Sequence, residues 1–275
     1  MGITELKREK AKADREIRYE ISQFATKMIH YSLQYKYLGY KFRLNAGPFL
    51  KEKLKQEQGL LCERLFWRIR NRADKIVKLS AEDLMKQFNI DFDMPGDDID
   101  NFLAADIEGD TTKNRIALYA GKLSGELEAF VSAGMFASLS SEKILDGFLG
   151  SLKAPFASAL VVGAMKSGEF LAARLANGEL QYGRGIYGSS FSNLTRLDYD
   201  VSQRVYVQNT VMGFAASGRY NAVIPRRASI VPCSICDEVA NRVFSLESGI
   251  LPNHPRCICF YEPTTVSDLS QLSTI

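Results

Sequence analysis

The chain has 275 residues, which is long enough for one large domain or two modest ones. Apolar residues make up 46% and charged residues 24%, close to the average of soluble globular proteins, so a disordered chain and a collagen-like fibre are excluded. The net charge of +3 hides an asymmetry: residues 1–80 carry 19 Lys or Arg against 9 Asp or Glu, whereas residues 81–110 carry 1 against 10. Charge therefore predicts boundaries near residues 80 and 110.

The sequence offers no segment that we expect to enter a membrane. The longest uncharged stretch of the most apolar region, Ala154 to Met165, has 12 residues, whereas a membrane-spanning helix needs about 20. The opening residues, MGITELKREKAKADRE, lack the apolar core of a secretory signal. We therefore expect no transmembrane helix, no export by that route and no membrane partner.

The basic segment 1–80 carries two apolar stripes at helical spacing. They predict one amphipathic helix up to about Tyr35 and a second one after the Gly-Pro break at 47–48. Ser80, with Asp83 three residues later, fits the N-cap pair of a further short helix. The stripes consist of Ile17, Ile21, Phe24 and Met28 in the first helix and of Cys62, Phe66, Ile69, Ala73 and Ile76 in the second.

Aromatic residues interleave with Lys and Arg in the basic segment, most densely over residues 31–49. Cations neutralise phosphates and aromatic rings stack on exposed bases, so the segment predicts DNA binding without sequence specificity. Helical packing explains the pattern equally well, with the tyrosines in the core and the cations in solvent. The candidate nucleic-acid-binding residues are Lys36, Lys41, Arg43, Arg64, Arg68, Arg70 and Arg72.

Residues 81–110 are expected to form a solvated acidic linker that docks on the basic segment. The stretch begins like a calcium loop, with Asp91 and Asp93 at the first and third positions. However, Pro95 stands at the fifth position and Phe102 at the twelfth, where the loop needs a bidentate Glu. A calcium site is therefore not predicted.

Residues 111–218 are expected to form a helical domain. Between Gly125 and Gly178 the sequence is rich in Ala, Gly, Ser and Leu, and small residues let helices approach closely, so two or three packed helices are predicted there. A last helix is predicted from Tyr199 to a stop at Gly218.

Four of the five cysteines crowd into the C-terminal segment 219–275. A C-x-x-C pair is followed 17 residues later by an H-x-x-C-x-C group, among short β-prone runs at 229–231, 242–244 and 257–261. Two cysteines on one tight turn can face one Zn²⁺ ion, and a second pair from a neighbouring strand completes the tetrahedron. Buried reduced thiols, or a disulfide formed on oxidation, fit the same pattern. The expected ligands are Cys233, Cys236 and Cys257, with either His254 or Cys259 as the fourth.

Catalytic interpretations of this cluster lack parts. The P-C-x-x-C at 232–236 is half of a zinc deaminase signature, but the H-x-E half is missing around both histidines, His30 and His254. An HNH-type nuclease needs further His or Asn ligands for its catalytic metal. A thioredoxin-like redox motif needs a βαβ context, which the flanks do not provide. His30 is expected to pack against an aromatic helix face.

The stretches RYNA at 219–222, VPCSICDEVANRVF at 231–244 and LPNHPRCIC at 251–259 resemble the C-terminal domain of the phage Mu F-like minor head protein family, also called the head morphogenesis family. The resemblance covers about 60 of the 275 residues. The helix before it reads VQNT at 207–210, without the acidic residue of the family's Arg-Thr-Glu sequence. The matching residues are Cys233, Cys236, Val243, Phe244, His254, Pro255, Cys257 and Cys259.

The resemblance implies a minor capsid protein of a tailed bacteriophage, with no catalysis in the matching module. Such a protein is expected in a few copies inside the virion head, and in the host cytoplasm during assembly, in contact with the portal, the major capsid protein or packaged DNA. The alternative function is a phage-encoded enzyme or effector, nuclease-like or a toxin, that carries the same module. For the fold, we predict a mainly α-helical chain with a small C-terminal α+β Cys/His module resembling a zinc knuckle.

Overall fold

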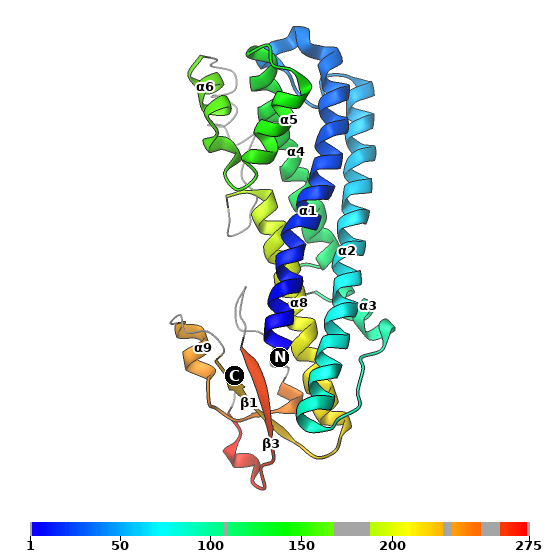
Figure 1. Ribbon diagram of the computed structural model, residues 1–275, viewed down its shortest axis with the longest axis vertical. Helices are drawn as coiled ribbons and strands as arrows, with labels where there is room; N and C mark the ends of the chain where they lie inside the picture. The colour runs from blue at the N-terminus through cyan, green and yellow to red at the C-terminus, as the bar shows by residue number, and fades with distance from the viewer. Residues whose placement is uncertain (1, 107–108, 168–187, 228–232, 249–258, 274–275) are drawn as a thin grey trace. The chain divides into compact units, whose positions relative to one another are not determined.

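Figure 1 shows the computed structural model of the chain, which describes residues 2–106, 109–167, 188–227, 233–248 and 259–273. The described part is mainly helical and carries a small antiparallel sheet of three strands near its C-terminus, so the predicted fold class is confirmed. None of the helices in this part is long and apolar enough to cross a membrane.

The helices are α1 (Gly2–Ser32), the 3₁₀ helix η1 (Leu33–Lys41), α2 (Pro48–Phe88), α3 (Gly96–Ala104), α4 (Thr112–Phe136), α5 (Ser141–Gly150), α6 (Ala159–Ser167), α8 (Ser190–Ala216) and α9 (Ser234–Val239). Shorter 3₁₀ turns lie at Pro155–Ala157, Leu246–Ser248 and Leu269–Gln271. The strands are β1 (Ala222–Arg226), β2 (Phe244–Ser245) and β3 (Phe260–Thr264).

Contacts divide the chain into two compact units. Unit 1 consists of Met1–Ala13, Ile69–Ala105 and Arg196–Ile275, and unit 2 consists of Asp14–Arg68 and Asp106–Thr195. Helices α1, α2 and α8 each contribute residues to both units. Each unit is therefore assembled from segments that are far apart in the sequence.

The core of unit 2 contains the first predicted apolar stripe. Ile17, Ile21, Phe24 and Met28 of α1 are at most 2% exposed, as their spacing predicts. His30 makes the expected contact with an aromatic ring, an edge-on contact with Tyr31, but its side chain is exposed rather than buried.

Helices α4 and α5 of unit 2 begin at side-chain caps and approach each other closely. Thr111 accepts a hydrogen bond at the start of α4, and Ser140 does so at the start of α5. At Gly134 an added Cβ would lie 2.3 Å from Cγ1 of Ile144. A small residue thus brings two helices of the middle region together, and α6 packs against α4 in the same unit.

The second predicted stripe is only half right. Ile69 and the later stripe residues are buried, but Cys62 and Phe66 are only half-buried, and Leu61 and Leu65 occupy the core in their place. Residues 61, 65 and 69 form one row at a spacing of four, and the next residue along lies about 100° further round the helix. Over the first half of α2, the predicted residues Cys62 and Phe66 therefore lie on the flank of the buried row instead of in it.

Helix α2 runs through Ser80 without a break, so the predicted short helix starting there is wrong. The Oγ atom of Ser80 lies 3.2 Å from the carbonyl oxygen of Tyr206 and 2.9 Å from Oγ1 of Thr210. Asp83 accepts a hydrogen bond of 2.7 Å from the Tyr206 hydroxyl. Both side chains of the expected cap pair are thus held by α8, within unit 1.

The acidic segment 81–110 carries most of its described carboxylates exposed, as expected, but it is anchored by buried apolar side chains between them. Met94 is 3% exposed and Leu103 of α3 is 1% exposed. The expected docking on a basic residue is present, because Nε of Arg70 lies 2.8 Å from Oδ1 of Asp100. Residues 81–105 of the segment belong to unit 1, in which these buried apolar side chains pack.

Helix α8 begins at Ser190, before the predicted Tyr199, and ends at Ala216. The predicted stop, Gly218, follows two residues later, and its φ of 63° is the left-handed conformation of a helix stop. Of the expected β-prone runs, 242–244 and 257–261 overlap β2 and β3, and 229–231 lies outside the described residues.

The sheet of unit 1 has the strand order β2-β1-β3, with both pairs antiparallel. In the register, Val223 of β1 pairs with Phe244 of β2. These two residues and Tyr261 of β3 pack in one cluster with Leu84 of α2 and Phe214 of α8. The sheet therefore shares its core with two long helices, and Figure 1 shows it at their side.

Candidate metal centre and neighbouring cavity

Three of the five predicted zinc ligands lie together in unit 1. Cys236 and Cys259 are 3% and 8% exposed, and the half-buried Cys233 packs against them. The Sγ atoms of Cys236 and Cys259 are 3.5 Å apart, whereas disulfide sulfurs are about 2.05 Å apart, so no disulfide joins these two residues. The other two candidates, His254 and Cys257, lie outside the described residues.

Helix α9 brings the C-x-x-C pair to the start of β3. Cys233 is the N-cap residue of α9, and its Sγ atom accepts a hydrogen bond of 3.5 Å from the backbone N–H of Cys236. Cys259 precedes β3, and its carbonyl oxygen accepts a 3.1 Å hydrogen bond from Nε2 of the buried Gln203 of α8. The turn of the cysteine pair follows from local spacing. Gln203 is 56 residues from Cys259 in the sequence, and no motif reveals it.

The distance between two of these thiols is compatible with the predicted structural Zn²⁺ ion. Thiolates bound at about 2.3 Å in a tetrahedron are separated by about 3.8 Å, close to the observed distance between Cys236 and Cys259. Among the described residues, no group of three or more His, Cys, Asp or Glu side chains has the geometry to hold a metal. The predicted set, Cys233, Cys236 and Cys257 with His254 or Cys259, needs at least one donor from the residues outside the described part, and His254 and Cys257 lie there.

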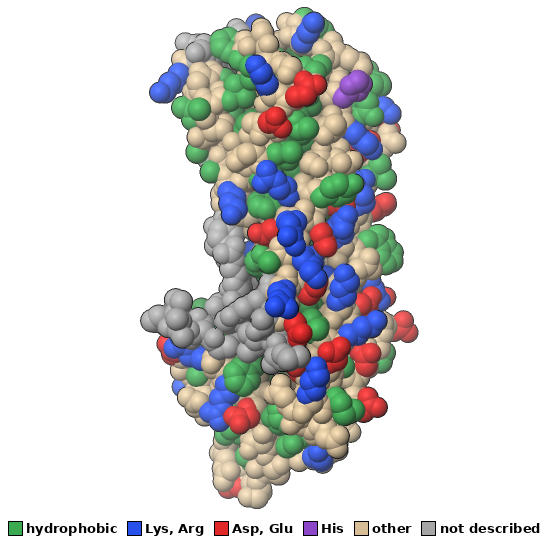
Figure 2. Space-filling model, viewed as in Figure 1, with side chains coloured by type: hydrophobic (Ala, Val, Ile, Leu, Met, Phe, Trp, Pro, Cys, Tyr) green, Lys and Arg blue, Asp and Glu red, His purple; other side chains and the backbone are tan. Residues whose placement is uncertain are grey.

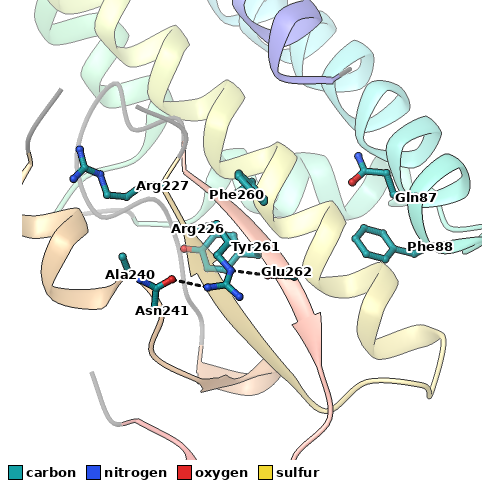
Figure 3. Close-up of a pocket in the computed structure, with 9 residues that line it drawn as sticks. All are labelled: Gln87, Phe88, Arg226, Arg227, Ala240, Asn241, Phe260, Tyr261 and Glu262. Carbon is teal, nitrogen blue, oxygen red and sulfur yellow. Dashed lines mark hydrogen bonds and ion pairs between the residues drawn. The ribbon is translucent and has the colours of Figure 1, made fainter. Parts of the chain in front are cut away.

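A cavity of about 630 Å³ lies in unit 1 (Figure 3), and one of its lining residues, Phe260, directly follows Cys259 in the chain. Aromatic rings and guanidinium groups line it, and Arg226 donates 2.5 Å hydrogen bonds to Oε2 of Glu262 and to Oδ1 of Asn241. Arg227 pairs with Asp237, so both cations of the lining have a carboxylate partner. No Ser, Thr, Cys or His is among the described residues that line the cavity. The described lining therefore offers no Ser, Thr or Cys nucleophile paired with a His base.

The predicted nucleic-acid-binding residues do not form one surface of unpaired cations. Lys36 and Lys41 are exposed, and Arg43 is half-buried with an interaction inside the protein. Arg70 is paired with Asp100 and also with a carboxylate one turn later on α2. On the face in Figure 2, Lys and Arg side chains over α1 and α2 are interspersed with Asp and Glu.

The remaining three cations of that set neutralise buried carboxylates. Within unit 2, Arg64 and Arg68 contact the two carboxylate oxygens of Glu20 at 2.6 and 2.5 Å, and Glu20 is 2% exposed. Within unit 1, Nε of Arg72 lies 3.0 Å from Oδ1 of Asp198, and both side chains are buried. A buried carboxylate without its cation costs several kcal/mol, so these arginines stabilise the fold. Arg72 is not at the surface, where a phosphate could meet it.

Comparison of the chain with protein-family models, with curated proteins and with solved structures found no match. The resemblance of the C-terminal module to the Mu F-like family therefore rests on the residues of that module alone.

Proposed function

We propose that the chain is a minor head protein of a tailed bacteriophage, held inside the head against the portal or the major capsid protein. The observation that carries the proposal is the Cys/His module. Cys233, Cys236 and Cys259 belong to the Mu F-like sequence pattern and converge where α9 meets β3. In this proposal the module, with zinc bound, stabilises the C-terminal end, and the helices supply the docking surface.

The groups with strongly shifted pKa values support an assembly protein over an enzyme. Burial raises the pKa of Glu126 to about 7, and burial together with a hydrogen bond to Asp83 raises the pKa of Tyr206. Catalytic groups with such shifts sit in clefts. Neither residue is among the described residues that line the cavity of Figure 3, and both make buried contacts inside their own unit.

Docking must use exposed residues rather than the apolar stripe of α1. Ile21 and Phe24 are entirely buried, so Asp at either position would unfold unit 2 instead of testing an interface. Trp67 of α2 is 58% exposed and is the only tryptophan of the chain. Exposed tryptophans are frequent anchors of protein interfaces, which makes Trp67 the surface residue to change.

The proposal is tested by mass spectrometry of purified particles from the phage that encodes this chain. We expect the protein in particles together with the portal and major capsid proteins. Trp67→Glu is expected to reduce its incorporation at least severalfold, while Trp67→Phe and the exposed control Lys51→Glu retain it. The absence of the protein from particles, or turnover of a small substrate by the isolated protein, would contradict the proposal.

A further inference from the structure

A second hollow, of about 400 Å³, lies on unit 2 and is rimmed by cations. Arg15 and Arg18 reach it from α1, and Lys153 reaches it from the turn that follows α5. Leu152 and Phe191 also line it and are 2% and 5% exposed, so the buried part of the lining is apolar.

The placement of the cations follows from the packing of α1 and α5. Ile17 is in the core, so Arg15 and Arg18 fall on the exposed flanks of the same helical turns. Residues three apart on a helix are neighbours, with Cβ atoms about 5–6 Å apart. The backbone N–H of Ala154 donates to the carbonyl oxygen of Ser151, and this bond shapes the turn that carries the third cation.

These three cations have no ion-pair partner among the described residues, unlike the arginines that bind Glu20 or Asp198. Arg15, Arg18 and Lys153 are all exposed. Asp14 is the only carboxylate among the described lining residues; it is half-buried and already engaged within the protein. The described rim therefore carries three positive charges against one negative charge. Like charges around one hollow repel each other, and a bound anion removes that repulsion.

A nucleic-acid backbone fits this rim better than an acidic polypeptide does. Duplex DNA carries one charge per about 1.7 Å of helix axis, a regular density that can meet several cations of one rim at once. Two of the three cations are arginines, whose planar donors match phosphate oxygens. The apolar Leu152 and Phe191 offer no hydrogen bond that could read a base edge.

We infer that the hollow bordered by Arg15, Arg18 and Lys153 binds the phosphate backbone of DNA without sequence specificity. This inference rests on the proposed function only for the identity of the DNA, which would be the packaged genome. It places the DNA contact on a set of cations that does not overlap the seven predicted from the sequence.

The test is a fluorescence-anisotropy titration of the full chain with a labelled duplex of random sequence at several salt concentrations. Three phosphate contacts contribute a slope of about −2.7 to log K against log salt, and a factor on the order of 100 in affinity at about 0.1 M salt. The triple variant Arg15→Gln/Arg18→Gln/Lys153→Gln is expected to lose this part of the salt slope and this factor in affinity. The control Lys51→Gln/Lys55→Gln/Lys143→Gln removes the same charge from exposed positions outside the hollow. This control is expected to keep most of the salt slope and most of the affinity for DNA. Circular dichroism verifies that both variants are folded.

Three outcomes would overturn the inference. They are a wild-type chain that fails to bind at low salt, an equal loss of affinity in both triple variants, and competition by polyglutamate as effective as competition by DNA. The last outcome would identify an acidic polypeptide as the ligand. Incorporation into particles is measured separately, so a virion protein that does not bind DNA is distinguishable from a DNA-binding protein that is absent from virions.

Discussion

Glu126 of α4 caps the first turn of α8 within unit 2. Its Oε1 atom accepts a 2.8 Å hydrogen bond from the backbone N–H of Ser190 and a 2.9 Å bond from the Ser190 hydroxyl. Its Oε2 atom has no hydrogen-bond partner among the described residues, and the side chain is 1% exposed. Burial raises the pKa of Glu126 to about 7, although the two bonds from Ser190 favour the charged form.

Replacement of Glu126 by Gln is expected to flatten the dependence of stability on pH. The folded chain keeps this carboxyl protonated up to a pH of about 7, whereas the unfolded chain releases the proton at about 4.5, so its contribution to the unfolding free energy falls as the pH rises between these values. A difference of this size corresponds to about 3 kcal/mol. Urea unfolding of the wild type and Glu126→Gln at pH 5 to 8 measures it, with the exposed Glu52→Gln as control. Identical pH slopes in the wild type and Glu126→Gln would contradict the assignment.

At the residue scale, the sequence could predict only the local part of the site. The C-x-x-C pair predicts a shared turn because Cys233 and Cys236 are three positions apart, and the structure places them on one turn. Arg72 was instead predicted to contact DNA, because its partner Asp198 is 126 positions away and no spacing rule connects the two. Cations that neutralise buried acids are indistinguishable in sequence from cations that face solvent, and Arg15 and Arg18 were overlooked for the same reason.

At the scale of elements, substitutions at two glycines of α4 distinguish the effect of helix propensity on stability from the effect of packing. Gly134 is in close contact with Ile144 of α5, whereas nothing lies within 4 Å of a Cβ added at Gly121. Gly121→Ala is expected to raise the unfolding free energy by about 0.5–1 kcal/mol, because Ala is the better helix former. Gly134→Ala is expected to lower it by about 1–3 kcal/mol, because the added methyl group overpacks the contact. Denaturant unfolding of both variants measures these two changes in unfolding free energy. Equal changes at the two positions would show that the close approach of Gly134 to Ile144 does not affect stability.

Periodicity predicted the existence of the long helices and failed at their ends and at one register. In α1 the predicted apolar residues form a single stripe, so their spacing alone predicts which residues face the core. Helix α2 has two adjacent rows of apolar residues, of which Leu61 and Leu65 are buried and Cys62 and Phe66 form the flank. Ser80 looked like a helix start because the pattern of a cap pair is local, whereas its actual partners belong to α8. Tertiary hydrogen bonds of this kind leave no trace in the spacing of residues.

At the scale of the whole molecule, the C-terminal module is not an appended domain. Its strands share one core cluster with Leu84 of α2 and with Val207 and Phe214 of α8. The sequence suggested a separate segment from residue 219, because the composition changes there. Removal of the module would expose apolar residues of both helices to water, so the module and the helices of unit 1 are expected to unfold together.

Zinc bound at the cysteine cluster is therefore expected to stabilise the helices of unit 1 as well as the module. A metal that binds only the folded chain raises the free energy of unfolding by about 4 kcal/mol when its free concentration is about 1,000 times its dissociation constant. Elemental analysis should find close to one zinc per chain. A chelator or Cys233→Ser should lower the denaturant midpoint of the helical circular-dichroism signal by a corresponding amount.

The matched control for the zinc prediction is Cys62→Ser, a half-buried cysteine of unit 2 outside the cluster. This variant is expected to keep its zinc and its response to the chelator, because Cys62 belongs to no ligand set. If only thiol reactivity changed on chelation while the helical midpoint stayed constant, the module would unfold independently of α2 and α8, in conflict with their shared core. Two results together would contradict the zinc prediction: purified protein that contains no metal, and an unchanged denaturant midpoint in Cys233→Ser. Cys236 and Cys259 would then be reduced buried thiols that pack against each other.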